Sequence, residues 1–495
     1  MLFCISAQAQ VLFNKRIKTY RGSGTAYSLK VQGNDFLLFG GLYYNYGPQY
    51  NIRYLVIKTD SVGDTLFTKS YGKIKNDFYP SYAGGVFKMK NDNYYYDIAT
   101  KADSTGHNKY FFYKLISNGD TIQTKGFGDT SFHAGTQTKI TRKYNLVASG
   151  QDGNLDPKGD FSLIKTDTLG NTFFIKYYGS TFYAEYSSSI DTCKDGGYIL
   201  GGYRQLGGPD NFVIYVVKTD SLGNSQWENT YGNYDATGIL TFKNQGYLIT
   251  GDYRDSVYNG FSFTRTNLIK IDNSGAVLWD KKYGTSCYGG EAIISYELSN
   301  GDIISCGQVG HINNPPVNNV VYGIYGFIMK TDSSGNLKFY QTYEATTDQG
   351  AENYLRDIKQ LPDGGFVAVG FVQPSDGTSQ DVWILRVDSN GCEIPGCALN
   401  TGIEKLATVN ATLSVYPNPT NGLLTVNYSI INPTCKDATL RLIEMGTGRV
   451  LISKTVPCNT TQTQIDLNEF ANGVYSLSIQ SNANAPQTIR VVKVQ

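Results

Sequence analysis

The sequence is poor in charge. Charged residues make up 17% of the 495 residues, and 43 Lys and Arg balance 42 Asp and Glu. This balance provides no electrostatic field that would attract nucleic acid or an anionic membrane. No apolar run approaches the roughly 20 residues that a membrane-spanning helix needs. We therefore expect neither a nucleic-acid partner nor a transmembrane segment.

Histidine and the familiar catalytic motifs are also scarce. The three histidines, His107, His133 and His311, lie far apart in the sequence, which argues against a catalytic triad or a multi-histidine metal site. The motifs G-x-S-x-G and H-E-x-x-H, phosphate-binding loops and EF-hand loops are absent. We expect no enzyme activity, no cofactor and no metal, although a pair of facing carboxylates depends on the fold and stays open.

No C-x-x-C motif occurs, so a zinc ribbon or a redox motif is not indicated. Cys392 and Cys397 are close enough for a small disulfide loop in an exported protein, and Cys435 and Cys458 could form a second disulfide. Three further cysteines in the repeated region have no assigned partner: Cys193, Cys287 and Cys306.

Residues 1–9 have features of the end of a secretory signal peptide. The apolar stretch LFCIS is followed by AQAQ, which supplies the small-x-small cleavage pattern of Ala7 and Ala9. We expect the mature chain to begin near Gln10. An ordinary frayed N-terminus is the alternative.

Glycine and tyrosine are abundant, with 54 and 39 residues, as expected for short strands joined by tight turns. The segment VVKTDSLGNSQWENTYG, residues 216–232, has related copies along the chain at intervals of fifty to sixty residues. Their turn glycines are Gly63, Gly119, Gly170, Gly223, Gly275, Gly335 and Gly391. A period of this length predicts a repeat architecture.

Each repeat holds four predicted strands, which in the fourth copy are 186–192, 198–203, 212–219 and 225–231. Seven units of four antiparallel strands are typical of a seven-bladed β-propeller, which we predict for residues 10–397. The seventh unit lacks a fourth strand, and Val11–Tyr20 matches one in pattern. We predict that this N-terminal strand closes the ring; an open solenoid is the less favoured alternative because it leaves the strand unused.

The repeated turn is interpreted as scaffold. In KTDSLGN the Asp220 carboxylate can accept bonds from backbone N–H groups two residues further on, and Gly223 can adopt the positive φ that the hairpin needs. The aromatic residues that follow, Trp227, Trp279 and Phe339, are predicted to pack between blades. The stretch resembles the Asp-box of sialidases, but Gly223 lies three positions after Asp220 rather than two, and such boxes are themselves structural.

Up to Cys397 the chain resembles a group of secreted bacterial propeller proteins, on matches such as KDGGYILGGY and VVKTDSLGNSQW. Residues 411–495 resemble the type A C-terminal sorting domain of the type IX secretion system of Bacteroidota. The residues that carry this second resemblance are Tyr416, Pro417, Asn418, Pro419, Gly446, Gly448, Gly473, Val474, Tyr475 and Lys493.

The second resemblance implies a small immunoglobulin-like β-sandwich that is recognised by the outer-membrane translocon. It also implies removal by a sortase, with processing in or just after the linker 398–410, and attachment to the cell surface. We therefore expect an all-β protein that is secreted or attached to the outer-membrane surface.

Ligand binding is expected on the connections between the second and third strands of the blades, around a central channel, because loops on rigid scaffolds carry function. Planar side chains there suit a glycan or a peptide: Tyr43, Tyr44, Tyr46, Tyr203, Arg204, Tyr253, Arg254 and Tyr258. Non-enzymatic binding or adhesion is the favoured function. A secreted polysaccharide-acting enzyme and a purely structural surface component are the alternatives.

Overall fold

The computed structural model of the chain describes most of the propeller repeats and most of the C-terminal region. The described residues are 12–19, 22–46, 49–72, 78–79, 85–88, 94–102, 108–127, 133–152, 159–207, 211–232, 235–244, 246–258, 261–288, 290–310, 323–346, 348, 350–394, 397, 411–430, 437–444, 449–458, 461–481 and 487–494. The chain divides into two compact units, Phe13–Arg386 and the remaining residues, which are described separately. The described part contains no helix with the length and hydropathy of a membrane span.

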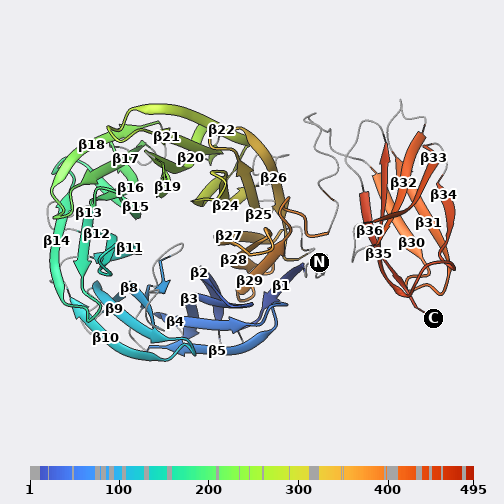
Figure 1. The fold of residues 1–495 in the computed structure, drawn as a ribbon, viewed down its shortest axis with the longest axis horizontal. Coiled ribbons are helices and arrows are strands. Elements are labelled where there is room, and N and C mark those ends of the chain that lie inside the picture. The colour runs from blue at the N-terminus through green and yellow to red at the C-terminus, as the bar shows by residue number, and fades with distance from the viewer. Residues whose placement is uncertain are drawn as a thin grey trace, which may run out of the picture. The chain divides into compact units, whose positions relative to one another are not determined.

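The first unit is a ring of antiparallel sheets, each formed by consecutive strands that we call A to D (Figure 1). The first blade comprises β2 (Ser23–Gln32), β3 (Asp35–Tyr46), β4 (Gln49–Thr59) and β5 (Thr65–Tyr71). The second comprises β6 (Phe78–Tyr79) and β7 (Phe87–Lys88), which both pair with β8 (Tyr94–Ala102), followed by β9 (Asn108–Ile116) and β10 (Thr121–Phe127). The third comprises β11 (His133–Ile140), β12 (Leu146–Asp152), β13 (Asp160–Thr166) and β14 (Thr172–Tyr178).

The fourth blade comprises β15 (Ala184–Thr192), β16 (Tyr198–Gln205), β17 (Phe212–Thr219) and β18 (Ser225–Tyr231). The fifth comprises β19 (Ala236–Thr241), β20 (Tyr247–Tyr258), β21 (Phe261–Ile271) and β22 (Val277–Tyr288). The sixth comprises β23 (Glu291–Glu297), β24 (Ile303–Gly310), β25 (Ile324–Thr331) and β26 (Leu337–Tyr343). The seventh comprises β27 (Glu352–Gln360), β28 (Phe366–Gln373) and β29 (Asp381–Val387), with β1 (Phe13–Ile17) as strand D. The predicted seven-bladed propeller is confirmed.

Strand β1 closes the ring, as predicted. It pairs antiparallel with β29, from Phe13 opposite Arg386 to Ile17 opposite Val382. The guanidinium of Arg16 donates to Asp381 at 2.6 Å, and the indole of Trp383 donates to Asn14 at 2.7 Å. The N-terminal segment therefore supplies backbone, ionic and side-chain bonds that would otherwise leave β29 with an open edge.

The blades are held together by apolar side chains from adjacent sheets. One core cluster combines Ile199 and Val216 of the fourth blade with Ile249 and Ile269 of the fifth, and Trp227 packs against it. Phe339, which is 8% exposed, faces Phe366 of the next blade at 6.5 Å between ring centroids. Trp279 packs against a cluster that spans the fifth and sixth blades. The predicted inter-blade packing of these aromatic residues is confirmed.

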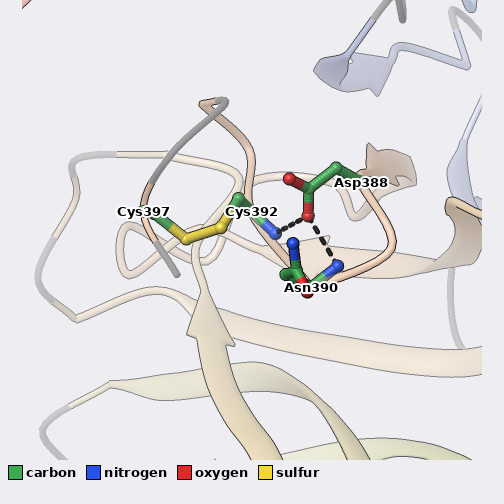
Figure 2. Close-up of a disulfide and its surroundings, with 4 residues drawn as sticks. All are labelled: Asp388, Asn390, Cys392 and Cys397. Atoms are coloured by element: carbon green, nitrogen blue, oxygen red, sulfur yellow. Dashed lines mark hydrogen bonds between the residues drawn. A yellow bond between two sulfur atoms is a disulfide. The ribbon is translucent and has the colours of Figure 1, made fainter. Parts of the chain in front are cut away.

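The repeated turn has the predicted geometry. One carboxylate oxygen of Asp220 accepts bonds from the backbone N–H groups of Leu222 and Asn224, both at 2.8 Å. Gly223 has a φ of 78°, a conformation that side chains with a Cβ rarely adopt. In the seventh copy Asp388 accepts bonds from the backbone N–H groups of Asn390 and Cys392, next to the Cys392–Cys397 disulfide (Figure 2).

The predicted disulfide between Cys392 and Cys397 is present. Cys458 is also disulfide-bonded, while Cys435, its predicted partner, lies outside the described residues. Cys193 and Cys306 are buried free thiols. The predicted signal-peptide remnant, the mature start at Gln10 and the linker 398–410 lie outside the described residues as well.

The C-terminal unit contains two sheets. One comprises β30 (Ala411–Tyr416), β31 (Leu423–Ile430) and β34 (Gln462–Asp466); the other comprises β33 (Val450–Pro457), β32 (Asp437–Glu444), β35 (Gly473–Ser481) and β36 (Gln487–Lys493). Alternate residues of both sheets, such as Val426 and Leu440, share one buried core. This is the predicted β-sandwich.

Candidate functional site at the B–C end of the propeller

The predicted ligand residues lie on strand B of three blades. Tyr43, Tyr44 and Tyr46 belong to β3, Tyr203 and Arg204 to β16, and Tyr253, Arg254 and Tyr258 to β20. The expected loops are shorter than predicted because strands B and C stay paired almost to the hairpin, with Tyr46 opposite Gln49 and Tyr258 opposite Phe261. The side chains of Tyr46 and Tyr258 lie outside the described part. We call this edge of the ring, where strands B lead into C and strands D into A, the B–C end.

The first-blade residues are engaged in packing. Tyr44 is 3% exposed and belongs to a core cluster shared by the first and seventh blades, under the guanidinium of Arg53. It is therefore not available to a ligand. The hydroxyl of Tyr43 lies 3.0 Å from that of Tyr27, on the neighbouring inner strand. In the fifth blade, the ring of Tyr253 lies under the ammonium of Lys282.

The fourth blade brings planar side chains to the inner side of the B–C end. Tyr203 stacks on Tyr186 of strand A with ring centroids 4.8 Å apart, and both side chains are half-buried. Arg204 donates to Glu185 at 2.7 Å and covers the ring of Tyr215. Burial raises the pKa of the Glu185 carboxyl to about 7, against the opposing effect of Arg204. The sequence predicted two of these residues and missed their partners on strand A.

The seventh blade carries a second stacked pair. Tyr354 of β27 stacks on Phe371 of β28 at 4.7 Å, and Tyr27 of the first blade meets Phe371 edge-on. The guanidinium of Arg356 lies over both stacked rings. Tyr354 and Arg356 are half-buried and lie on the innermost strand. Planar groups therefore occur at this end in both the fourth and the seventh blade.

Three acidic side chains gather between these pairs, in the fifth and sixth blades. Asp235 precedes β19, and Glu291 begins β23. Asp252 follows Gly251, the last residue of β20 that pairs with β19. We call these three residues the carboxylate cluster. Gly251 allows the backbone segments at Asp235 and Asp252 to approach each other, because a Cβ at Gly251 would lie 2.2 Å from the backbone oxygen of Asp235. That oxygen accepts a bond from the N–H of Asp252 at 3.2 Å.

Burial and neighbouring negative charge disfavour the ionised forms of the two aspartates in the carboxylate cluster. Burial, followed by the charge of Glu291, raises the pKa of Asp235 well above its usual range, and the same causes act on Asp252. Burial also raises the pKa of Glu291, and the nearby Arg356 opposes this shift. Titratable groups with such shifts concentrate at functional sites.

Hydrogen-bond acceptors with no donor lie within the cluster and on its neighbour Gln308. Asp235 Oδ1, Asp252 Oδ1 and Gln308 Oε1 are buried and accept no hydrogen bond within the described structure. Asp252 is 5% exposed, and Gln308 donates its amide to Glu291 at 2.9 Å. Buried acceptors are usually paired, because an unpaired one costs about 1–3 kcal/mol. No three or more His, Cys, Asp or Glu among the described residues are arranged to hold a metal ion.

The residue after Arg356 on the innermost strand of the seventh blade contrasts with this arrangement. Asp357 is fully buried, and its carboxylate accepts bonds from the backbone N–H of Leu29, the hydroxyl of Tyr296 and the ammonium of Lys359. These bonds join the seventh blade to the first and the sixth. A buried carboxylate with a full set of hydrogen-bond donors has a structural role. The carboxylate cluster lacks such a set of donors within the described residues.

A cavity of about 320 Å³ between the fourth and fifth blades is lined by scaffold residues, among them Trp227 and Asn273. Its buried cation, Lys218, donates to Asp195 at 2.7 Å and to Gln226 at 2.8 Å. The buried cation of this cavity is therefore already paired, which makes the cavity a weaker candidate than the B–C end.

The sequence signal for the missed acidic residues is weak. The residue after the strand B glycine is apolar or aromatic in three copies, at Leu42, Tyr203 and Phe371, and polar in three others, at Gln151, Asp252 and Gln308. A polar residue at this position therefore does not by itself indicate the site.

Several residues predicted to form the sorting signal are brought together by the fold of the C-terminal unit. Asn418 accepts a bond from the N–H of Val492 at 2.8 Å and donates to the oxygen of Arg490 at 2.7 Å. Lys493 donates to the oxygen of Phe470, and Tyr475 to that of Ala471. The Pro-Asn-Pro segment thus docks on the last strand. Gly446 and Gly448 lie outside the described residues.

Comparison with known proteins identifies this unit. Residues 414–494 match the family model described as secretion system C-terminal sorting domain. A comparison with curated proteins found no match.

Solved structures with similar folds were found for the chain, all at low identity. They include an α-L-arabinanase of Penicillium chrysogenum solved with arabinobiose, with 11% identity over 76% of this chain and 99% of that chain and a TM-score of 0.41. A second is an α-L-arabinofuranosidase of Fusarium graminearum, with 11% identity over 77% and 97% and a TM-score of 0.39. A third is the WD40 domain of SCAP from fission yeast, with 8% identity over 77% and 99% and a TM-score of 0.35. Similarity at this level carries no argument about activity.

The match and the strand order give a consistent assignment for the two units. The C-terminal motif residues dock on the last strand of the matched segment, and the preceding sheets form a closed propeller. Residues 414–494 are a C-terminal sorting domain of the type IX secretion system, and the protein is a β-propeller secreted to the cell surface or the extracellular space.

Proposed function

We propose that the propeller binds a glycan without cleaving it, through the inner side of the B–C end. The observation that carries this proposal is the placement of stacked planar side chains and unpaired carboxylate oxygens at the same end of the ring. Flat aromatic faces offer apolar contact, and carboxylate oxygens accept hydrogen bonds from hydroxyl groups. Saccharide rings present both kinds of surface.

The sorting domain interacts with the type IX secretion machinery. We further propose that a sortase releases this domain and leaves the propeller attached to the cell surface, where it acts in adhesion or capture. Support comes from Asn418 and Lys493, whose bonds to Arg490 and Phe470 bring together motif residues from distant parts of the domain.

Glycoside cleavage is the second candidate function, and the carboxylate cluster is the observation that favours it. Hydrolysis uses one carboxyl that stays protonated and a second that is ionised. In this cluster the pKa values of Asp235, Asp252 and Glu291 all rise. A common direction of shift does not separate an acid from a base, so binding is favoured.

A polysaccharide and oligosaccharide panel tests the proposal on the full chain. We expect saturable binding to one saccharide class with no release of reducing ends. Tyr354→Ala should weaken binding at least tenfold, because it removes the stacked ring beside Arg356. Asp376→Asn, at an exposed turn residue of the same end, is the matched control and should leave binding unchanged. If the protein cleaved a saccharide and Glu291→Gln abolished that cleavage, glycoside hydrolysis would replace binding as the proposed function.

A further inference from the structure

The carboxylate cluster holds more negative charge than nearby cations compensate. Glu291 interacts with Arg356, whereas neither Asp235 nor Asp252 forms an ion pair within the described part of the chain. Three carboxylates against one guanidinium leave up to two uncompensated negative charges in a buried place. Such an arrangement is unfavourable unless protons or an external cation neutralise it.

The unpaired acceptors come from two adjacent blades. Asp235 and Asp252 belong to the fifth blade, and Gln308 belongs to strand B of the sixth, opposite Glu291 in the strand register. The bond from the Gln308 amide to Glu291 fixes the amide, so that its oxygen is the free end. A partner that takes the place of these protons must bring several donors to this region and carry positive charge.

A primary ammonium group meets both conditions. It is compact, carries one positive charge and has three N–H donors. A guanidinium is planar and suited to bidentate contact with one carboxylate, whereas these acceptors belong to three different side chains. A metal ion is disfavoured, because no set of three acidic, histidine or cysteine side chains within the described ranges is arranged to hold one.

We infer that the carboxylate cluster receives the free amino group of a saccharide, so that the ligand class is an amino sugar that is not N-acetylated. This inference rests on the proposed function, and it adds the chemistry by which one glycan class is selected. The sugar ring of the ligand would contact the planar groups of the seventh blade, Tyr354 and Arg356, which lie next to the sixth.

Selection follows from the cost of an acetylated ligand. An N-acetyl group carries no positive charge and offers one N–H donor, so it would leave at least one buried carboxylate unpaired. Sites with buried polar groups discriminate strongly against ligands that cannot pair them. We therefore expect the free amine to bind at least tenfold more tightly than the acetylated form.

The test compares three probes on the full chain by titration calorimetry: an oligomer of glucosamine, the same oligomer fully N-acetylated, and a short lysine-containing peptide. We expect tight binding to the glucosamine oligomer alone. Asp252→Asn and Glu291→Gln should each reduce the preference for the free amine to less than threefold. Asp376→Asn should retain it, and Gln308→Glu, which adds an acidic group, should increase it.

The outcomes separate the inference from the proposed function. Equal affinity for the free and acetylated oligomers overturns the ammonium inference, while glycan binding stands. If the lysine peptide binds as tightly as the amino sugar, the site recognises the ammonium of a peptide. That result overturns both the amino-sugar inference and the proposed glycan binding. A preference that survives in the folded Glu291→Gln and Asp252→Asn variants also overturns the inference. Binding of some other glycan with no effect of these variants leaves only the proposed function supported.

Discussion

At the scale of single residues, two kinds of buried carboxylate are distinguished by their hydrogen bonds. Asp357 has donors from three blades, whereas Asp252 Oδ1 has none within the described structure. The first arrangement stabilises the fold, and the second retains unfavourable charge at a place where a ligand could compensate it. Natural binding sites commonly reduce stability in this way.

This difference predicts opposite effects of the same substitution. The folded pKa of Asp252 is raised, so the folded state holds more protons than the unfolded state between the unfolded value of about 4 and the folded value. Stability therefore falls as pH rises through that window. Asp252→Asn should raise the free energy of unfolding by about 0.5–2 kcal/mol at pH 7.5, and this gain should shrink towards pH 4.

Denaturant unfolding at both pH values is the measurement, and Asp357→Asn is the control. That variant weakens several bonds between blades and should lose about 2–4 kcal/mol at pH 7.5. If Asp252→Asn instead lost stability at pH 7.5, Asp252 would be part of the scaffold and the site would need another location.

At the scale of elements, the repeat allowed most strands to be predicted. The hairpin turns, the inter-blade aromatic residues and the pairing of β1 with β29 all follow from patterns that recur along the chain. The strand ends were harder to predict. Strands β3 and β20 continue to Tyr46 and Tyr258 because B–C pairing overrides the polar, tyrosine-rich composition that suggested loops.

The site was only partly predictable for the same reason. Tyr203 and Arg204 do lie at the inner side of the B–C end, but their partners Tyr186 and Glu185 come from another strand. The carboxylate cluster combines three strands from two blades, so sequence spacing alone does not show it. Burial of Tyr44 was equally hidden, since neighbouring residues of a strand alternate in direction.

Removal of strand β1 tests the closure of the ring. Deleting residues 11–20 removes the Arg16–Asp381 ion pair, the Asn14–Trp383 bond and the buried side chain of Ile17. We expect Tm to fall by several degrees and the chain to self-associate through the exposed edge of β29. Deleting residues 1–9 alone is the control and should leave Tm unchanged. A Tm that also stayed constant after deletion of residues 11–20 would contradict the closure.

At the scale of the whole molecule, export and binding are assigned to separate units. A chain that ends after Cys397 lacks the domain at residues 414–494 and should remain inside the cell envelope. Fractionation of cells that express it should show loss from the surface and medium, whereas full-length Glu469→Gln should be exported as the parent is. Normal export of the truncated chain would show that the sorting domain is not the signal that the cell uses.

The binding assignment is tested most directly by one titration. The saccharide selected from the panel is titrated into the full chain and into the Tyr354→Ala, Asp252→Asn and Asp376→Asn variants. We expect at least a tenfold loss of affinity for the first two variants and parent affinity for the third, with the saccharide recovered intact. Unchanged affinity in both Tyr354→Ala and Asp252→Asn, or cleavage of the saccharide, would contradict the binding assignment.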